Sequence, residues 1–268
     1  MSNERHGALQ KVLNVDFAVT KVPEITATFW VIKVLTTGMG EAASDFLVRR
    51  YGGPVAVPIG FVLFGAALLW QLTLRRYHTW VYWLAVAMVS VFGTMAADVL
   101  HIGLGIPYLV SSIFYVFVLG VVFGVWYQFE NTLSIHSILT RRRELFYWSA
   151  VLSTFALGTA VGDLTAKTFN LGYLSSTFMF AAMIAVPTLI FWRTRAHPVL
   201  WFWAAYVLTR PLGASAADYM AVDRVRGGIG LGYGVVVLVW TAAIVVFVAY
   251  LAISHRDVAP GTSKPQRR

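Results

Sequence analysis

The stretch FWVIKVLTTGMGEAASD, residues 29–45, decides the fold because its pattern occurs four times. Each copy begins with an aromatic residue and a tryptophan, followed by a glycine ten positions after the tryptophan and an aspartate five positions later. The other copies occupy residues 82–98, 147–163 and 202–218. A fixed spacing repeated along the chain indicates one structural unit used four times.

Three kinds of residue are the signature of this repeat. They are Trp30, Trp83, Trp148 and Trp203; Gly40, Gly93, Gly158 and Gly213; and Asp45, Asp98, Asp163 and Asp218. The glycines have small neighbours and predict close helix contacts, because small residues let membrane helices approach each other. The tryptophans fit either interfacial anchors or packing between repeats.

The composition is that of an integral membrane protein. Of the 268 residues, 58% are hydrophobic and only 12% are charged, against about a quarter charged in soluble domains. The chain has no cysteine, which excludes disulfides, thiolate metal sites and cysteine nucleophiles. A net charge of +9 is better explained by basic loops on one side of a membrane than by nucleic-acid binding. The lipid bilayer is therefore the expected partner, and nucleic acid is not.

The chain predicts eight membrane-spanning helices, since a span needs about 20 mostly apolar residues. The predicted spans are 24–48, 54–74, 79–101, 106–127, 144–168, 172–192, 199–221 and 229–253. The motif always lies on the first span of a pair, so every repeat enters from the same side and the repeats are parallel. We expect an all-α polytopic membrane protein with a pseudo-fourfold arrangement of two-helix repeats.

The same reading divides the chain into segments. The predicted segments are an N-terminal segment 1–23, repeats at 24–74, 79–127, 144–192 and 199–253, a linker 128–143 and a disordered tail 254–268. Fourteen Lys and Arg residues lie on the side of the termini and five on the other. This asymmetry predicts a multi-pass protein of the bacterial inner membrane with both termini, the linker and the tail in the cytoplasm.

Residues four positions apart share one face of a helix, so each aspartate defines a stripe. In repeat one the stripe contains Lys33, Thr37, Glu41 and Asp45, and in repeat four it contains Tyr206, Arg210, Ala214 and Asp218. Repeats two and three carry Ser90, Thr94, Phe155 and Thr159 on their stripes. Carboxylates inside a membrane are costly and normally face the bundle interior or a water-filled cavity.

We expect Asp45, Asp98, Asp163 and Asp218 to form a ring of oxygen ligands, with Glu41 one turn away as the coupling acid. Lys33 and Arg210 would be internal counter-charges, although Lys33 could equally extend to the interface. Five acids against two bases would recruit protons or a cation. Hard oxygen ligands favour magnesium, calcium or manganese, or protons and sodium, over zinc or copper, and a divalent, manganese-like ion is taken for the hypothesis. His101 is the only nearby nitrogen, and an interfacial role is preferred for it.

These residues predict a membrane transporter or exporter of a small cation, coupled to protons. A bound divalent cation at the four aspartates is the only cofactor that this hypothesis implies. The alternatives are a transporter of a small organic solute whose carboxylate meets Arg210 or Lys33, and a non-transporting scaffold or sensor with structural aspartates. No catalytic constellation is present in the sequence, so an enzyme is not expected. The ion, the direction of transport and the oligomeric state stay open.

The four copies resemble a bacterial family of membrane proteins built from four tandem two-helix repeats with a characteristic tryptophan. That family is a repeat of unknown function, described as an uncharacterised membrane-anchored protein. The most specific segment is Lys21-Val22-Pro23-Glu24 together with Phe29-Trp30, Lys33, Thr36-Thr37, Gly40-Glu41 and Asp45. The resemblance covers about residues 20–255. It implies the repeats and the eight spans but no substrate.

Overall fold

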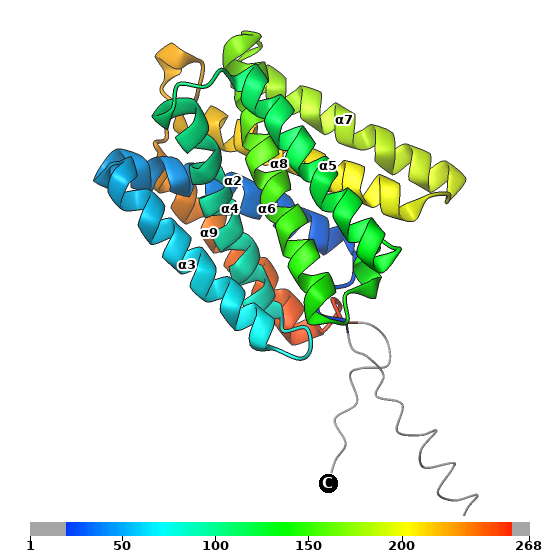
Figure 1. Cartoon of the computed structure of the whole chain (residues 1–268). Helices are drawn as coiled ribbons and strands as arrows, with labels where there is room; N and C mark the ends of the chain where they lie inside the picture. The colour runs from blue at the N-terminus through cyan, green and yellow to red at the C-terminus, as the bar shows by residue number, and fades with distance from the viewer. Residues whose placement is uncertain (1–19, 259–268) are drawn as a thin grey trace, which may run out of the picture.

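The computed structural model describes residues 20–258, and this part of the chain holds eight long helices and no strand (Figure 1). They are α2 (Ala27–Tyr51), α3 (Gly53–Thr73), α4 (Thr79–Asp98), α5 (Tyr108–Glu130), α6 (Arg141–Asp163), α7 (Gly172–Thr194), α8 (Pro198–Ala221) and α9 (Tyr233–Ser254). The all-α class and the number of helices confirm the prediction for the described residues, and the helix ends shift by a few positions.

Two of the predicted spans end in a change of helix type. After α4 and α6 the chain continues as π-helical segments, Val99–Gly103 and Leu164–Thr168. Both segments start directly after a motif aspartate, Asp98 or Asp163. A π-helical turn is rare and often marks a functional position. In repeats two and three such a turn begins directly after the motif aspartate.

Six of the helices in the described part of the chain are long and apolar enough to cross a membrane. The two that do not meet this description are α2 and α8, which carry Lys33, Glu41 and Arg210. These charges are tolerable because they are buried against other helices rather than exposed to lipid.

Helix ends follow the local sequence. Thr26 caps α2 by accepting a hydrogen bond from the Phe29 amide (3.2 Å), and Thr140 caps α6 by accepting one from the Arg143 amide (3.3 Å). Gly52 joins α2 to α3 with φ of +80°, a conformation that only glycine adopts at low cost. The helices of repeat one are thus joined by a single residue.

The first helix of each repeat lies in the centre of the molecule. α2 packs on α4, α4 on α6, α6 on α8, and α8 on α2, which closes a ring. The second helix of each repeat packs outside on the first helix of the next repeat: α3 on α4, α5 on α6, α7 on α8, and α9 on α2. The two helices of one repeat make fewer contacts with each other than with the neighbouring repeat.

The motif aromatics explain the ring. The residue before each tryptophan packs against the tryptophan of the next repeat, with ring centroids 5.6 to 6.2 Å apart. The pairs are Phe29 with Trp83, Tyr82 with Trp148, Tyr147 with Trp203, and Phe202 with Trp30. The same two positions of the motif meet at each of the four interfaces, as expected when the four inner helices run in one direction. The tryptophans therefore pack between repeats.

The motif glycines occupy the next contact along the ring. A Cβ atom added at Gly40 would overlap Ser90, and one at Gly93 would lie 2.7 Å from Cβ of Phe155. Added carbons at Gly158 and Gly213 would overlap Arg210 and Thr37 in the same way. Each glycine thus touches the residue that lies three positions before the glycine of the following repeat, which confirms the predicted close contacts.

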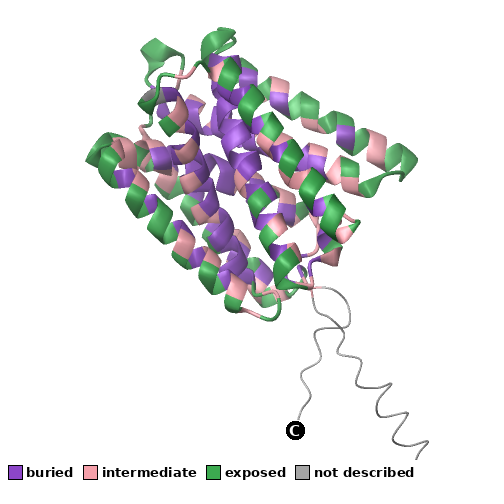
Figure 2. Ribbon diagram, in the orientation of Figure 1, coloured by how far each residue is buried: buried purple, intermediate pink, exposed green. Residues whose placement is uncertain are grey.

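Burial separates the inner and outer helices (Figure 2). α6 is buried over most of its length, whereas the outer helices expose large apolar residues such as Phe117 (68% exposed), Phe178 (68%) and Leu238 (71%). An exposed apolar belt of this kind is what a membrane protein presents to lipid.

Two segment boundaries differ from the sequence reading. α5 continues to Glu130 and α6 begins at Arg141, so the linker is shorter than 128–143 and contains only a 3-10 turn, Ile135–Ser137. The predicted tail began at 254, but Ser254 ends α9 and Asp257 is 1% exposed, because its carboxylate accepts hydrogen bonds from Tyr77 and Thr79. Residues 1–19 and 259–268 lie outside the described residues, so the predictions for them stay predictions.

Candidate functional site

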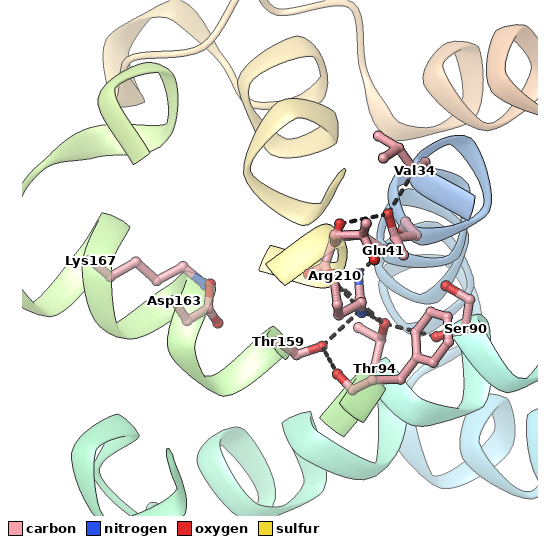
Figure 3. Close-up of polar contacts among 11 residues, drawn as sticks. Val34, Glu41, Ser90, Thr94, Thr159, Asp163, Lys167 and Arg210 are labelled. Atoms are coloured by element: carbon pink, nitrogen blue, oxygen red, sulfur yellow. Dashed lines mark hydrogen bonds and ion pairs between the residues drawn. The ribbon is translucent and has the colours of Figure 1, made fainter. Parts of the chain in front are cut away.

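Arg210 lies in the middle of the ring of inner helices and is fully buried (Figure 3). Its Nη2 atom donates to Glu41 Oε2 (2.7 Å) and Thr159 Oγ1 (2.7 Å), and also to Thr94 Oγ1. Its Nη1 atom donates to the carbonyl oxygen of Thr37 (2.9 Å). One guanidinium group therefore connects all four inner helices.

The partners of Arg210 share one register of the repeat. Glu41, Thr94 and Thr159 each lie four positions before their motif aspartate, in repeats one, two and three. The corresponding residue of repeat four is Ala214, which leaves room for the arginine from its own helix. Arg210 therefore points from one repeat to the equivalent position of the three others.

The threonines are oriented to accept hydrogen bonds from the arginine. Thr94 donates its hydroxyl hydrogen to the Ser90 carbonyl (3.0 Å), and Thr159 donates to the Phe155 carbonyl (3.1 Å). Each hydroxyl oxygen is then free to accept from Arg210. A buried ion pair needs such additional hydrogen bonds, because the attraction of the two charges alone barely offsets their desolvation.

Lys33 lies near this ion pair but has no carboxylate partner among the described residues. Its side chain is 1% exposed, and Nζ lies 4.0 Å above the ring of Phe155 and 4.1 Å above the ring of Tyr206. The amino group makes no hydrogen bond within the described part of the chain. Among the described residues Arg210, rather than Lys33, is the ion-pair partner of Glu41, and the buried amino group of Lys33 lies over two aromatic rings instead of extending to the surface.

The four motif aspartates differ in burial and in partners. Asp163 and Asp218 are buried, whereas Asp45 and Asp98 are partly exposed. Asp45 pairs with Arg49 (3.4 Å) and Asp163 with Lys167 (2.8 Å), each one helical turn further along the chain. Asp98 and Asp218 have no ion pair with any described residue. Two of the four negative charges are thus neutralised locally.

The aspartates do not converge on one point. Between residues 20 and 258, no three histidines, aspartates or glutamates are close enough together to hold a metal ion. The structure therefore brings Glu41 and Arg210 together and leaves the aspartates as a loose acidic group at one end of the ring.

The opposite end of the ring is closed by aromatic side chains. Phe29, Tyr82 and Tyr147 are each 1% exposed, and the hydroxyl groups of the two tyrosines are 2.5 Å apart. These residues lie one more helical step along the stripes, beyond Lys33 and its equivalents. An ion that entered among the aspartates would therefore meet Arg210 first, then Lys33, and then this aromatic layer.

His101 is held within its own repeat. Its Nδ1 atom lies 3.0 Å from Ser111 Oγ, and its ring packs on Tyr108 with centroids 4.4 Å apart. It is 7% exposed and is not part of a ligand group among the described residues. Nδ1 is thus hydrogen-bonded and the ring is packed, whereas Nε2 is buried with no hydrogen-bond partner among the described residues.

Sequence reasoning missed a second buried ion pair. Lys21 Nζ lies 2.5 Å from Glu144 Oε2, and Gln71 Nε2 donates to Glu144 Oε1 (3.0 Å). Glu144 follows three consecutive arginines and is the first residue of the predicted span 144–168, so its carboxylate has no predicted partner. No periodicity in the sequence joins these three residues, which come from three different segments.

Comparison with known proteins identifies the repeat. The family model described as Repeat of Unknown Function (DUF347) matches residues 28–77, 81–132, 146–197 and 201–257, which is well over half of the chain. Each matched segment contains one motif helix and the helix that follows it. Neither the curated proteins nor the solved structures include a significant match.

Proposed function

This chain belongs to the family Repeat of Unknown Function (DUF347), and we propose that it is a membrane transporter that moves a cation in exchange for protons. The proposal places all eight helices in the bilayer as four parallel repeats with pseudo-fourfold symmetry. It places both termini on the cytoplasmic side of a bacterial inner membrane, and it includes no enzymatic activity. The closed ring of contacts between α2, α4, α6 and α8 supports the symmetry.

The observation that carries the proposal is the position of Arg210. Its guanidinium group occupies the centre of the ring and is bound by the equivalent residues of the other three repeats. A permanently charged arginine there repels any cation while it holds Glu41. A cation that reaches Glu41 must displace the arginine, and a proton that reaches Glu41 weakens the ion pair.

The charge balance supports exchange rather than permanent storage of a metal. The sequence suggested five acids against two bases, but Arg49 and Lys167 neutralise two of the acids. With Glu41 paired to Arg210, the groups of this set that are unpaired within residues 20–258 are Asp98 and Asp218, which are acidic, and Lys33, which is basic. Their formal charges leave an excess of one negative charge. A weakly negative site binds a cation loosely enough to release it. The choice of a divalent, manganese-like ion requires these carboxylates to move toward Glu41 during transport.

A small organic anion is the second candidate, because Lys33 and Arg210 lie on the same aromatic ring. Nζ of Lys33 is 4.0 Å and Cζ of Arg210 is 5.4 Å from the centroid of Phe155. A carboxylate could accept hydrogen bonds from both groups. A scaffold or sensor with structural aspartates is the third reading, and it predicts no transport of either kind.

The test is transport by the purified protein in liposomes. Entry of manganese, calcium, magnesium and sodium would be followed with and without a pH gradient, for the wild type and for Glu41→Gln. Glu41→Gln loses the negative charge that the cation must reach and the charge-assisted hydrogen bond from Arg210, which should slow cation flux by about tenfold or more. Asp223→Asn is the control, because Asp223 is exposed and its ion pair among residues 20–258 is with Arg226, next to it on the same short turn.

Three outcomes separate the readings. Cation flux that depends on Glu41 and on the pH gradient supports the proposal. Equal flux in Glu41→Gln and the wild type contradicts it. Absence of cation flux, with a rise in thermal stability on adding small dicarboxylates, favours the organic anion, because a ligand that binds only the folded state stabilises it.

A further inference from the structure

Trp30 differs from the other three motif tryptophans. Trp83, Trp148 and Trp203 are 2%, 2% and 5% exposed, whereas Trp30 is only partly buried. Trp30 lines a cavity of about 360 Å³ between α2, α7, α8 and the segment 133–136. Known ligand pockets have volumes of about 300–1,000 Å³, so this space is large enough for a ligand.

The repeats explain why this position is open. Trp203 is covered by α5, because Phe123 and Trp126 lie 4.9 and 5.9 Å from its ring. When Asp98 is aligned with Asp163, Phe123 corresponds to Thr188 and Trp126 to Phe191. Thr188 and Phe191 line the cavity beside Trp30. Smaller residues of α7 have thus replaced the side chains that fill the equivalent space in the preceding repeat.

The cavity is apolar inside and basic at its rim. Pro187, Val199, Phe202 and Ala205 are among its apolar lining residues, and His136 also borders it. The Arg195 guanidinium lies 5.5 Å from the ring centroid of Phe191, so it sits beside the cavity wall. In the alignment of the repeats Arg195 replaces Glu130, an acid that pairs with Arg142 and Arg143. A basic residue thus stands at this position of α7 where α5 has an acidic one.

The surface around the cavity faces lipid in a membrane-spanning bundle. Leu189, Trp192 and Leu200 flank the lining residues and are 57%, 62% and 58% exposed. An apolar cavity next to such a surface can admit an acyl chain directly from the bilayer. Basic groups at the same depth then meet the headgroup.

We propose that this cavity is a binding site for an anionic phospholipid of the surrounding bilayer. One acyl chain packs against Trp30 and Thr188, and the phosphate accepts hydrogen bonds from Arg195 and His136. The site is independent of the ion pair between Glu41 and Arg210. Its occupant would nevertheless contact Phe202 and Trp30, which belong to the aromatic layer at the end of the inner ring.

The experiment is native mass spectrometry of the full chain in detergent, with phosphatidylglycerol and phosphatidylcholine added in turn. The wild type should retain one phosphatidylglycerol more strongly than phosphatidylcholine. Thr188→Phe restores the residue of the preceding repeat and should remove that lipid by filling the cavity. Arg195→Gln should weaken phosphatidylglycerol about fivefold, the effect of one basic residue at a membrane surface, and should leave phosphatidylcholine unchanged.

Arg193→Gln is the matched control. Arg193 lies two positions away, but its guanidinium is 6.0 Å from the ring of Trp192, which does not line the cavity. Retention of phosphatidylglycerol by Thr188→Phe at the wild-type level would overturn the proposal. An equal loss in Arg193→Gln and Arg195→Gln would overturn it too, since the lipid would then be bound only by the general basic surface. A thermal melt of Thr188→Phe at or above the wild-type temperature shows that the variant is folded.

Discussion

The two ends of the helix bundle are held together in different ways. At the end that carries Lys21 and Asp257, called here the terminal end, two buried carboxylates join segments far apart in the chain. Glu144 binds Lys21 and Gln71, and Asp257 accepts hydrogen bonds from Tyr77 (2.6 Å) and Thr79 (2.9 Å). Backbone hydrogen bonds from Lys21 to Ile138 and from Glu24 to Asp257 add to these links.

At the other end, called the aspartate end, the ion pairs lie within single segments. Asp45 pairs with Arg49 and Asp163 with Lys167, both at a spacing of four residues, and Asp223 pairs with Arg226 at a spacing of three. At this end α2 and α9, which pack along their lengths, share a long, exposed side-chain hydrogen bond from Arg49 to Tyr233 (3.5 Å). Because local pairs do not join helices, the aspartate end can separate more easily. Any opening of the ring should start there.

Tyr77 makes the stability of the terminal end depend on pH. Burial, followed by the charge of Asp257, raises the pKa of Tyr77 above its ordinary value. Tyr77 therefore stays protonated and donates to Asp257 at physiological pH. The stabilisation is present below the unfolded-state pKa of about 10 and is lost as the pH rises above it, because only the unfolded chain then releases the proton.

The largest effect should come from breaking the terminal end. Glu144→Gln leaves Lys21 buried without a charge partner, and removal of one member of a buried pair typically costs about 3–5 kcal/mol. Denaturant unfolding of the purified protein measures the loss. The double variant Lys21→Met with Glu144→Leu should recover most of it, because apolar replacement of both partners removes the desolvation cost. Equal stability of Glu144→Gln and the wild type would mean that this ion pair does not hold the end together.

The sequence predicted those contacts whose residues recur at helical spacing. The stripes that carry Glu41 and Arg210 follow from spacings of four, and these two side chains form an ion pair in the structure. The pair of Asp45 with Arg49 has the same spacing, but Arg49 lies just beyond the predicted span 24–48 and counts among the five basic residues on the side opposite the termini. Periodic contacts within helices and between equivalent repeats can thus be read from one sequence.

The remaining contacts depend on how distant segments meet. Lys21 and Glu144 are separated by more than a hundred residues, and nothing in their local sequence distinguishes them from surface charges. The role of Thr94 and Thr159 as acceptors also depends on the conformation of Arg210, although both lie on the predicted stripes. The predicted convergence of the aspartates assumed equal geometry in four copies, and local partners make the copies unequal.

A cysteine comparison would show directly which end opens. The chain has no cysteine, and Ala85 and Ala97 are both fully buried in α4, near its terminal and aspartate ends. Ala97→Cys should react with a small thiol reagent about tenfold faster than Ala85→Cys, a difference of about 1.4 kcal/mol in local opening. Reaction after denaturation gives the control rate for each thiol. Faster labelling of Ala85→Cys than of Ala97→Cys would show that the terminal end, and not the aspartate end, opens more easily.

The smallest change in stability should come from the aspartate end itself. Asp45→Asn removes an ion pair whose arginine side chain is 53% exposed, and exposed pairs contribute about 0.2–1 kcal/mol. The same denaturant unfolding that detects Glu144→Gln should therefore barely distinguish Asp45→Asn from the wild type. A loss as large as that of Glu144→Gln would show that Asp45 has a structural role and that the two ends are equally fixed. A normal melt with reduced cation flux would instead assign Asp45 to the path of the ion, because its carboxylate would then be dispensable for folding alone.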